Sequence, residues 1–281
     1  MMLLPQMLAA RLQLTVVSYN TAVSACRAGS RWEQAVALLH TLKAGSQRLA
    51  PNAITYNSVI AACERGSRWE AAIGVLEGMQ APDIIGYNTA LSACEKGHQW
   101  VIALTLLAVF RARIVKVDTV SYNAVVSACE KARQWEHACH LLLHDMGAHT
   151  VRPNLVTYNA AISSCHGDAD QWGLSLALLH RMRHSAVQLN VVTYNAAMAS
   201  ATASGSRVTW PAVLSLIQDM QMCKVQPDAT SYNATLVSLQ HGRQWAWAAH
   251  LLDEMHHSGT PCDILSYLAF VKASEFAGCC P

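Results

Sequence analysis

Residues 16–26 read VVSYNTAVSAC, and near-copies return along the chain as AITYNSVIAAC, IIGYNTALSAC, TVSYNAVVSAC, LVTYNAAISSC, VVTYNAAMASA and ATSYNATLVSL. A Tyr-Asn dipeptide marks every copy, and its asparagines are Asn20, Asn57, Asn88, Asn123, Asn159, Asn195 and Asn233. Neighbouring asparagines are 31 to 38 residues apart. A period of this length is typical of chains that stack one short structural unit many times.

Each copy continues into a second marked segment. A Trp follows each asparagine by 12 to 15 residues, at Trp32, Trp69, Trp100, Trp135, Trp172, Trp210 and Trp245. Apolar residues then recur at helical spacing, so the Trp is predicted to open a second helix and to pack in its core. Between the two segments lies a turn such as RAGSR, and Pro-Asn or Pro-Asp closes most copies, where a helix cannot easily continue. Hydroxyls such as those of Ser18 and Thr55 are the predicted N-caps of the first helices.

These markers predict seven helix-turn-helix repeats and two fragments. The repeats are 16–52, 53–83, 84–118, 119–154, 155–190, 191–228 and 229–263. Residues 1–15 are predicted to be a remnant second helix of an upstream repeat, and residues 264–281 a partial eighth repeat or C-terminal cap helix. No strand-like alternation is sustained, and a helix pair of this size buries its apolar face only by stacking on neighbours. The predicted fold class is therefore an all-α solenoid.

Composition narrows the functional classes. Of the 281 residues, 52% are hydrophobic and 14% charged, with a formal net charge of +2. This composition argues against a disordered tail and against a protein that binds nucleic acid mainly through non-specific electrostatic attraction. The longest nearly apolar run, residues 100–110, is too short to span a membrane, so no membrane partner is expected. The opening MMLLPQMLAARLQL carries no legible targeting signal.

The period, the V-[TS]-Y-N opening and the Pro-Asp or Pro-Asn ending together resemble the pentatricopeptide repeat family, over residues 16–263. The Gln-Trp or Arg-Trp that opens the second helix looks like the versions common in dinoflagellate members. The resemblance implies a right-handed superhelix that binds single-stranded RNA at one base per repeat and acts in processing, stability, editing or translation of transcripts in a chloroplast or mitochondrion. Other RNA-processing proteins would be its partners.

In that family the base is read by the Asn near the start of the first helix and by the last residue of the repeat. The pairs carried over are Asn20 with Asn52, Asn57 with Asp83, Asn88 with Asp118, Asn123 with Asn154, Asn159 with Asn190, Asn195 with Asp228, and Asn233 with Asp263. The amide offers a donor and an acceptor to a pyrimidine edge; Asp as second reader favours uracil and Asn favours cytosine. The implied target is pyrimidine-U-U-pyrimidine-pyrimidine-U-U. Helix packing would explain a recurring Asn, but we do not expect it to explain Asn or Asp at every repeat end.

Two further sets of residues carry over from the resemblance. Apolar residues three places before each Asn would sandwich the bases: Val17, Ile54, Ile85, Val120, Val156 and Val192, with Thr230 as the poorest match. Basic residues at the first-helix end would reach phosphates, and Arg65, Lys96 and Lys131 match, whereas Ala28, Gly167 and Ala203 do not. Leu268 stands where an eighth Asn would be, so no base reading is expected there.

Other chemistry finds little support in the sequence. Cys26, Cys63, Cys94, Cys129 and Cys165 recur with the repeat and are predicted to be small buried residues rather than metal ligands. His137, His140 and His144 share one helix face without an accompanying carboxylate. We expect no metal, no cofactor and no enzymatic activity, because no catalytic motif occurs in a plausible context. Two alternatives stay open: a tetratricopeptide-like protein-binding scaffold, and the RNA-binding part of a processing enzyme whose catalytic module is missing.

Overall fold

The computed structural model describes residues 15–44, 50–113, 116–166, 171–185 and 187–275. These residues form helices and connecting turns, and no strand occurs among them. The chain divides into two compact blocks, residues 1–132 and 133–281. The predicted helix at residues 1–15 lies outside the described part, apart from Thr15. No described helix is both long and apolar enough to cross a lipid bilayer.

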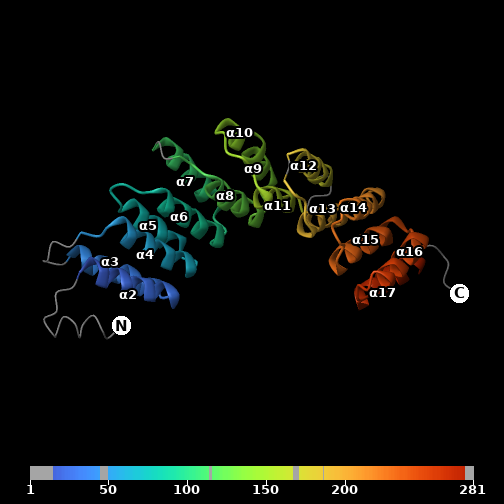
Figure 1. Ribbon diagram of the computed structural model, residues 1–281, viewed down its shortest axis with the longest axis horizontal. Helices are drawn as coiled ribbons and strands as arrows, with labels where there is room; N and C mark the ends of the chain where they lie inside the picture. The colour runs from blue at the N-terminus through green and yellow to red at the C-terminus, as the bar shows by residue number, and fades with distance from the viewer. Residues whose placement is uncertain (1–14, 45–49, 114–115, 167–170, 186, 276–281) are drawn as a thin grey trace. The chain divides into compact units, whose positions relative to one another are not determined.

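Each repeat opens with one helix, and these first helices stack on one another within a block (Figure 1). In the first block they are α2 (Val16–Ala28), α4 (Ala53–Arg65), α6 (Ile84–Lys96) and α8 (Thr119–Lys131). In the second block they are α11 (Leu155–Ser164), α13 (Val191–Ala203), α15 (Ala229–Gly242) and α17 (Ile264–Glu275). The stacking of equivalent helices gives every block one row of equivalent side chains.

The second helices begin at the tryptophans. They are α3 (Trp32–Ala44), α5 (Trp69–Glu77) and α7 (Trp100–Ala112) in the first block, and α12 (Trp172–His184), α14 (Trp210–Met222) and α16 (Trp245–His257) in the second. In the repeat that spans the two blocks, α9 (Trp135–His140) continues through a π-helical turn, η1 (Leu141–Asp145), into α10 (Met146–Ala148). The predicted start of the second helix at each Trp is confirmed.

The core lies between the first and second helices. The tyrosine of the Tyr-Asn dipeptide points into it, since Tyr87, Tyr122 and Tyr194 are at most 2% exposed. Tyr87 stacks on Phe110 of α7, with ring centroids 4.2 Å apart and planes 7° apart. The predicted burial of the five recurring cysteines is confirmed. Burial raises the pKa of the Cys63 and Cys94 thiols to about 11, so these side chains are neutral packing groups at physiological pH.

Three of the tryptophans, Trp32, Trp69 and Trp210, lie against the turn of the following repeat. They are half-buried, and Trp245 is 41% exposed, so the prediction of core packing is wrong. A Cβ added at Gly66 would lie 2.7 Å from Cδ1 of Trp32, and one at Gly97 would lie 2.5 Å from Cδ1 of Trp69. The indole edge of one repeat therefore occupies the space over the turn of the following repeat, and glycine is needed there for close approach.

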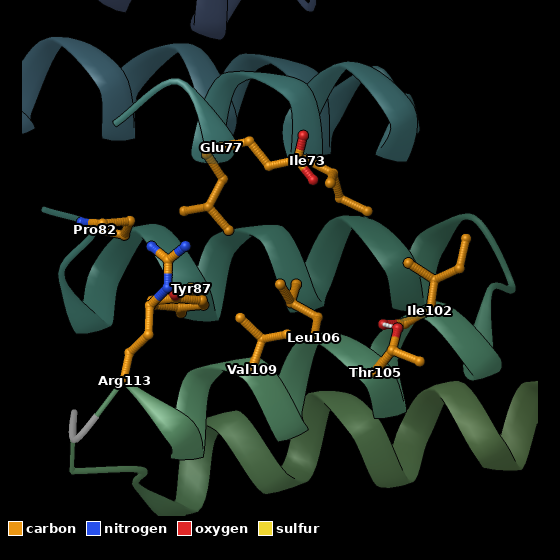
Figure 2. Close-up of a pocket in the computed structure, with 10 residues that line it drawn as sticks. Ile73, Glu77, Pro82, Tyr87, Ile102, Thr105, Leu106, Val109 and Arg113 are labelled. Carbon is orange, nitrogen blue, oxygen red and sulfur yellow. Dashed lines mark hydrogen bonds between the residues drawn. The ribbon is translucent and has the colours of Figure 1, made fainter. Parts of the chain in front are cut away.

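A groove opens between second helices where one of them is short. Helix α5 has nine residues, whereas α3 and α7 have 13, because the repeat 53–83 is the shortest. Ile73 of α5 lies across a pocket of about 430 Å³ from Leu106 and Val109 of α7 (Figure 2), and Leu76 also lines this pocket. None of the predicted RNA-contacting residues lines this pocket.

Candidate nucleic-acid interface

The last residue of each repeat caps the first helix of the next repeat. Oδ1 of Asn52 accepts the Thr55 backbone N–H at 2.9 Å, and Oδ1 of Asp118 accepts that of Ser121 at 2.9 Å. The same bond is made by Asp83, Asn154, Asn190, Asp228 and Asp263. N-caps favour Asn, Asp, Ser and Thr. Capping therefore accounts for Asn or Asp at every repeat end without a ligand, contrary to the expectation from the sequence.

The position of the predicted capping hydroxyls is wrong by three residues. Thr15 and Asn52 are the N-caps of α2 and α4, and Ser18 and Thr55 lie at the third helical position. Thr55 completes a capping box, because its hydroxyl accepts the Asn52 backbone N–H at 3.4 Å. The hydroxyl at this third position also has a second role, which concerns the preceding repeat.

Five hydroxyls at this third position donate to the Tyr-Asn asparagine of the repeat before them. These contacts join hydroxyl oxygen and asparagine Oδ1: Thr55–Asn20 at 2.6 Å, Ser121–Asn88 at 2.5 Å, Thr193–Asn159 at 2.6 Å, Ser231–Asn195 at 2.6 Å and Ser266–Asn233 at 2.7 Å. The acceptor half of each amide is thus engaged inside the protein. The amide therefore offers its N–H donor to a ligand. From the sequence alone, the amide was expected to offer both a donor and an acceptor.

In the Asp-ended repeats the two predicted base-reading residues bond to each other. Asn88 Nδ2 donates to Oδ1 and Oδ2 of Asp118 at 3.2 and 3.3 Å. The other three pairs of this kind are Asn57–Asp83, Asn195–Asp228 and Asn233–Asp263, at 3.0 to 3.1 Å. An amide nitrogen carries a second proton and a carboxylate has further lone pairs. Each pair therefore presents a donor and an acceptor side by side.

Two of these carboxylates are held in the ionised form. Burial opposes the ionisation of Asp228, but donation from the Ser231 backbone N–H, the Asn195 amide and the Ser231 hydroxyl keeps its pKa below the ordinary value. The same donors from Ser266, with the Asn233 amide, lower the pKa of the exposed Asp263. An ionised carboxylate only accepts hydrogen bonds. The acceptor character of these two sites is therefore stable at neutral pH.

The Asn-ended repeats have a different arrangement. Asn159 makes its described hydrogen bond with Thr193, and Oδ1 of Asn190 accepts both the backbone N–H and the hydroxyl of Thr193, at 3.0 and 2.9 Å. Asn20 and Asn52 form the same arrangement with Thr55. With both carbonyl oxygens engaged, two amide nitrogens are left to face a ligand. The remaining predicted pair is divided between the blocks, with Asn123 in the first and Asn154, the cap of α11, in the second.

One repeat lacks the hydroxyl. Gly86 occupies the third position of α6, and Oδ1 of Asn57 is buried without a hydrogen-bond partner among the described residues. A Cβ at Gly86 would meet this oxygen at 2.9 Å. Asn57 thus sits in the space that a serine would occupy elsewhere, and only Asp83 holds its amide.

The predicted base-sandwiching residues form an exposed apolar row. Their exposed fractions are Val17 67%, Ile54 63%, Ile85 59%, Val120 58%, Val156 52% and Val192 60%, and Thr230 is exposed as well. Each lies three residues before its Asn, and residues three apart share a helix face. Exposed valine and isoleucine at the same position of these first helices indicate, within each block, a surface that binds a ligand. Leu268 of α17 is also exposed.

The predicted phosphate-binding residues are exposed, but two of them already have acidic partners. Lys96 Nζ lies 2.8 Å from Glu64 and Lys131 Nζ lies 2.9 Å from Glu95, each glutamate coming from the preceding repeat. Arg65 ends α4 and is exposed. Partly exposed pairs of this kind contribute at most about 1 kcal/mol. A phosphate would therefore compete with a carboxylate for both lysines.

Metal chemistry has no site in the described part of the chain, where no three His, Cys, Asp or Glu side chains are grouped to hold an ion. His140 and His144, which the sequence placed on one face, are exposed; His140 immediately precedes the π-helical turn and His144 lies within it. Their rings are tilted 37° to each other, with centroids 5.4 Å apart.

Family models match this architecture in three places. A pentatricopeptide repeat domain model matches residues 2–65, a PPR repeat model residues 54–81 and a PPR repeat family model residues 117–167. These matches identify pentatricopeptide repeats over residues 2–81 and 117–167. Comparison with curated protein sequences finds no match.

Solved structures of pentatricopeptide repeat proteins have the same fold. The structure of PPR10 from maize matches with a TM-score of 0.67 and 23% identity, covering 99% of this chain and 44% of that one. PPR10 in complex with an 18-nt psaJ RNA element matches with a TM-score of 0.63, at the same identity and coverage. The PPR domain of Arabidopsis thaliana protein-only RNase P 1, in complex with tRNA, matches at 0.55 and 15% identity, over 66% of this chain and 95% of that one. These likenesses confirm the all-α solenoid, and the chain spans less than half the length of the PPR10 structures.

Sequence reasoning missed two features of this pentatricopeptide repeat protein. The hydroxyl at the third helical position was visible as the Ser or Thr of S-Y-N and T-Y-N, but its partner lies 33 to 36 residues away. The glycine at the end of a first helix was read as a turn signal, although Gly66 and Gly97 have φ of −81° and −83° and serve to admit an indole.

Proposed function

We propose that the protein binds single-stranded RNA with sequence selectivity, one base per repeat. The observation that carries the proposal is the alternation of donor–acceptor pairs at Asp-ended repeats with donor–donor pairs at Asn-ended repeats, beside an exposed apolar row. By family resemblance the RNA is an organellar transcript, in a chloroplast or mitochondrion. The protein acts as a non-catalytic adaptor in its processing, stability, editing or translation, with other RNA-processing proteins as partners.

The chemistry of the pairs selects among pyrimidines. Uracil presents an acceptor, O2, beside a donor, N3–H, which complements an asparagine N–H next to an ionised Asp. Cytosine presents two acceptors, O2 and N3, which complement two amide nitrogens. The resulting target, from 5′ to 3′, is CUUCCUU. The fourth base is carried over from the sequence resemblance alone.

Hydrophobic contact supplies the second part of the binding free energy. Side chains such as Val156 and Val192 lie next to the pairs and can cover the faces of unstacked bases, as side chains do in other proteins that bind single strands. Charge contributes less, because the chain carries a net charge of only +2. RNA as the ligand is supported by the solved relatives whose structures contain an RNA element or tRNA.

Filter binding tests the proposal directly. The full chain should bind CUUCCUU more tightly than the purine heptamer GAAGGAA at a fixed salt concentration, and RNA recovered with the purified protein should be enriched in the pyrimidine heptamer. Equal binding of the two oligonucleotides, or binding of neither, would reject base reading.

Ile85→Ala should weaken binding of CUUCCUU by about fivefold, since truncating a side chain that covers a base costs about 1 kcal/mol. The free energy of unfolding should change by less than about 0.5 kcal/mol, because Ile85 is 59% exposed. Val101→Ala is the matched control, since Val101 is 51% exposed but lies on the second helix α7. An equal loss of affinity in both variants would contradict the sandwich role.

Glu95→Gln should strengthen RNA binding about twofold, because it releases Lys131 for a phosphate. The slope of log K against log salt concentration should become steeper by about 0.7, the value for one added phosphate contact on a single strand. Glu70→Gln, at an exposed position of α5, removes the same charge away from the predicted interface. An unchanged slope in Glu95→Gln would show that Lys131 does not reach a phosphate.

A further inference from the structure

The hydroxyl at the third position of a first helix belongs to one repeat and orients an amide of the repeat before it. In Asp-ended repeats the carboxylate also holds that amide, because Asn88 Nδ2 bonds to both oxygens of Asp118. In Asn-ended repeats no carboxylate is present. For Asn159 the Thr193 hydroxyl is the hydrogen-bond partner within the described residues.

The geometry of this contact fixes its polarity. The Thr193 Oγ1–Asn159 distance of 2.6 Å is typical of an O–H···O bond and too short for an ordinary amide N–H donor. The hydroxyl proton has a second acceptor in Oδ1 of Asn190, at 2.9 Å, but that oxygen already accepts the Thr193 backbone N–H at 3.0 Å. The shorter contact therefore takes the proton, and Oδ1 of Asn159 is turned toward the protein.

Burial makes the hydroxyl a fixed part of the site. Thr55 and Thr193 are 0% exposed, as are Ser121, Ser231 and Ser266. The terminal torsion of an asparagine is broad and roughly two-fold, so an amide without such a contact can turn by 180° and exchange its N–H for its carbonyl. A turned amide would present an acceptor where a pyrimidine also presents one, O2.

We propose that Thr193 and Thr55 are positioning residues for base recognition: their hydroxyls set which half of the Asn159 and Asn20 amides faces the RNA, and so impose pyrimidine over purine at the Asn-ended repeats. The inference rests on the proposed function. On this proposal, the residues that recognise one base come from two successive repeats. Helix α17, which has Leu268 in place of an asparagine, still serves the seventh site through Ser266.

The test measures Kd for CUUCCUU and for the same heptamer with A or U at the fifth position. Thr193→Val keeps the shape and the backbone N–H but removes the hydroxyl, and should lower the preference for C over A at that position about fivefold, the value of one hydrogen bond. The preference for C over U, which Asn190 sets, should change less than twofold. Thr193→Ser retains the hydroxyl and should behave as the wild type.

A matched variant separates orientation from stability. Ser121→Ala removes the hydroxyl that faces Asn88, but Asp118 still holds the amide, so the preference for U over A at the third base should change less than twofold. Thr55→Val repeats the first test at the first base, with thermal unfolding checked for each variant, and gives the answer if Thr193→Val does not fold. If a folded Thr-to-Val variant keeps the preference for C over A, the positioning role is wrong but the proposed function stands. Failure of the wild type to bind, or to distinguish C from A, overturns the proposed function and the inference with it.

Discussion

Asp118→Asn should reverse the choice of base at the third position, from uracil to cytosine. In the native protein Asp118 offers an acceptor beside the Asn88 amide nitrogen. Asparagine keeps the capping bond from Ser121, because Asn and Asp cap equally well, but replaces the acceptor by a donor. The arrangement then equals the one that Asn159 and Asn190 form with Thr193.

The expected shift in the preference for U over C is about 1–3 kcal/mol, the range for one pair of base-edge hydrogen bonds. It would be measured as the ratio of Kd for CUUCCUU to that for CUCCCUU. The sixth position, read by Asn195 and Asp228, serves as an internal control and should keep its preference. Asn190→Asp should produce the opposite change at the fifth base. If neither variant alters the ratio while both remain folded, the repeat-end residues are caps and nothing more.

Phe110→Ala should be the most destabilising single change in the first block. Phe110 is fully buried and its ring stacks on Tyr87 of the neighbouring first helix. Truncating a buried Phe costs about 3–5 kcal/mol through lost burial and the cavity left behind, and loss of the aromatic pair is part of that cost. Because neighbouring repeats support one another, the loss should lower the free energy of unfolding of the stack around α6 and α7.

Urea unfolding followed by circular dichroism measures this effect. Val109→Ala, one residue earlier on the same helix, is the matched control: Val109 is 45% exposed, and its truncation should cost about 0.5 kcal/mol. RNA binding at low urea should be retained in both variants, since neither side chain lies among the predicted base-contacting residues. A loss below about 1 kcal/mol in Phe110→Ala would contradict the assignment of this pair to the core.

The two-helix repeat could be predicted from the sequence because it depends on features local to each copy. Tyr122 and Cys129 lie seven residues apart on one face of α8, and both are fully buried; the burial of Cys129 was predicted from the recurrence of cysteine with the repeat. Val120 and Asn123 recur with them but lie on another face of the same helix. Val120 is exposed and Asn123 is half-buried. Helical periodicity fixes which side chains share a face, whereas the candidate RNA-binding residues on that face were named from the resemblance to the pentatricopeptide repeat family.

The partners of those side chains could not be named, because they come from the neighbouring repeat. These contacts depend on how successive helices stack. Examples are the hydrogen bond of Asn159 with a hydroxyl, the ion pair of Lys131 with Glu95, and the packing of Trp69 over Gly97. Asp118 is a further example. Its place in the sequence suits a base-reading residue, but its capping hydrogen bond from the Ser121 backbone N–H at the start of α8 is seen only in the structure. The sequence by itself determined the repeat and the faces of its helices, since both follow from the geometry of a single helix. The tertiary structure decided the polarity and the partners of each polar group, since a hydrogen bond requires two groups within about 3 Å, and only packing brings residues 30 or more positions apart to that distance.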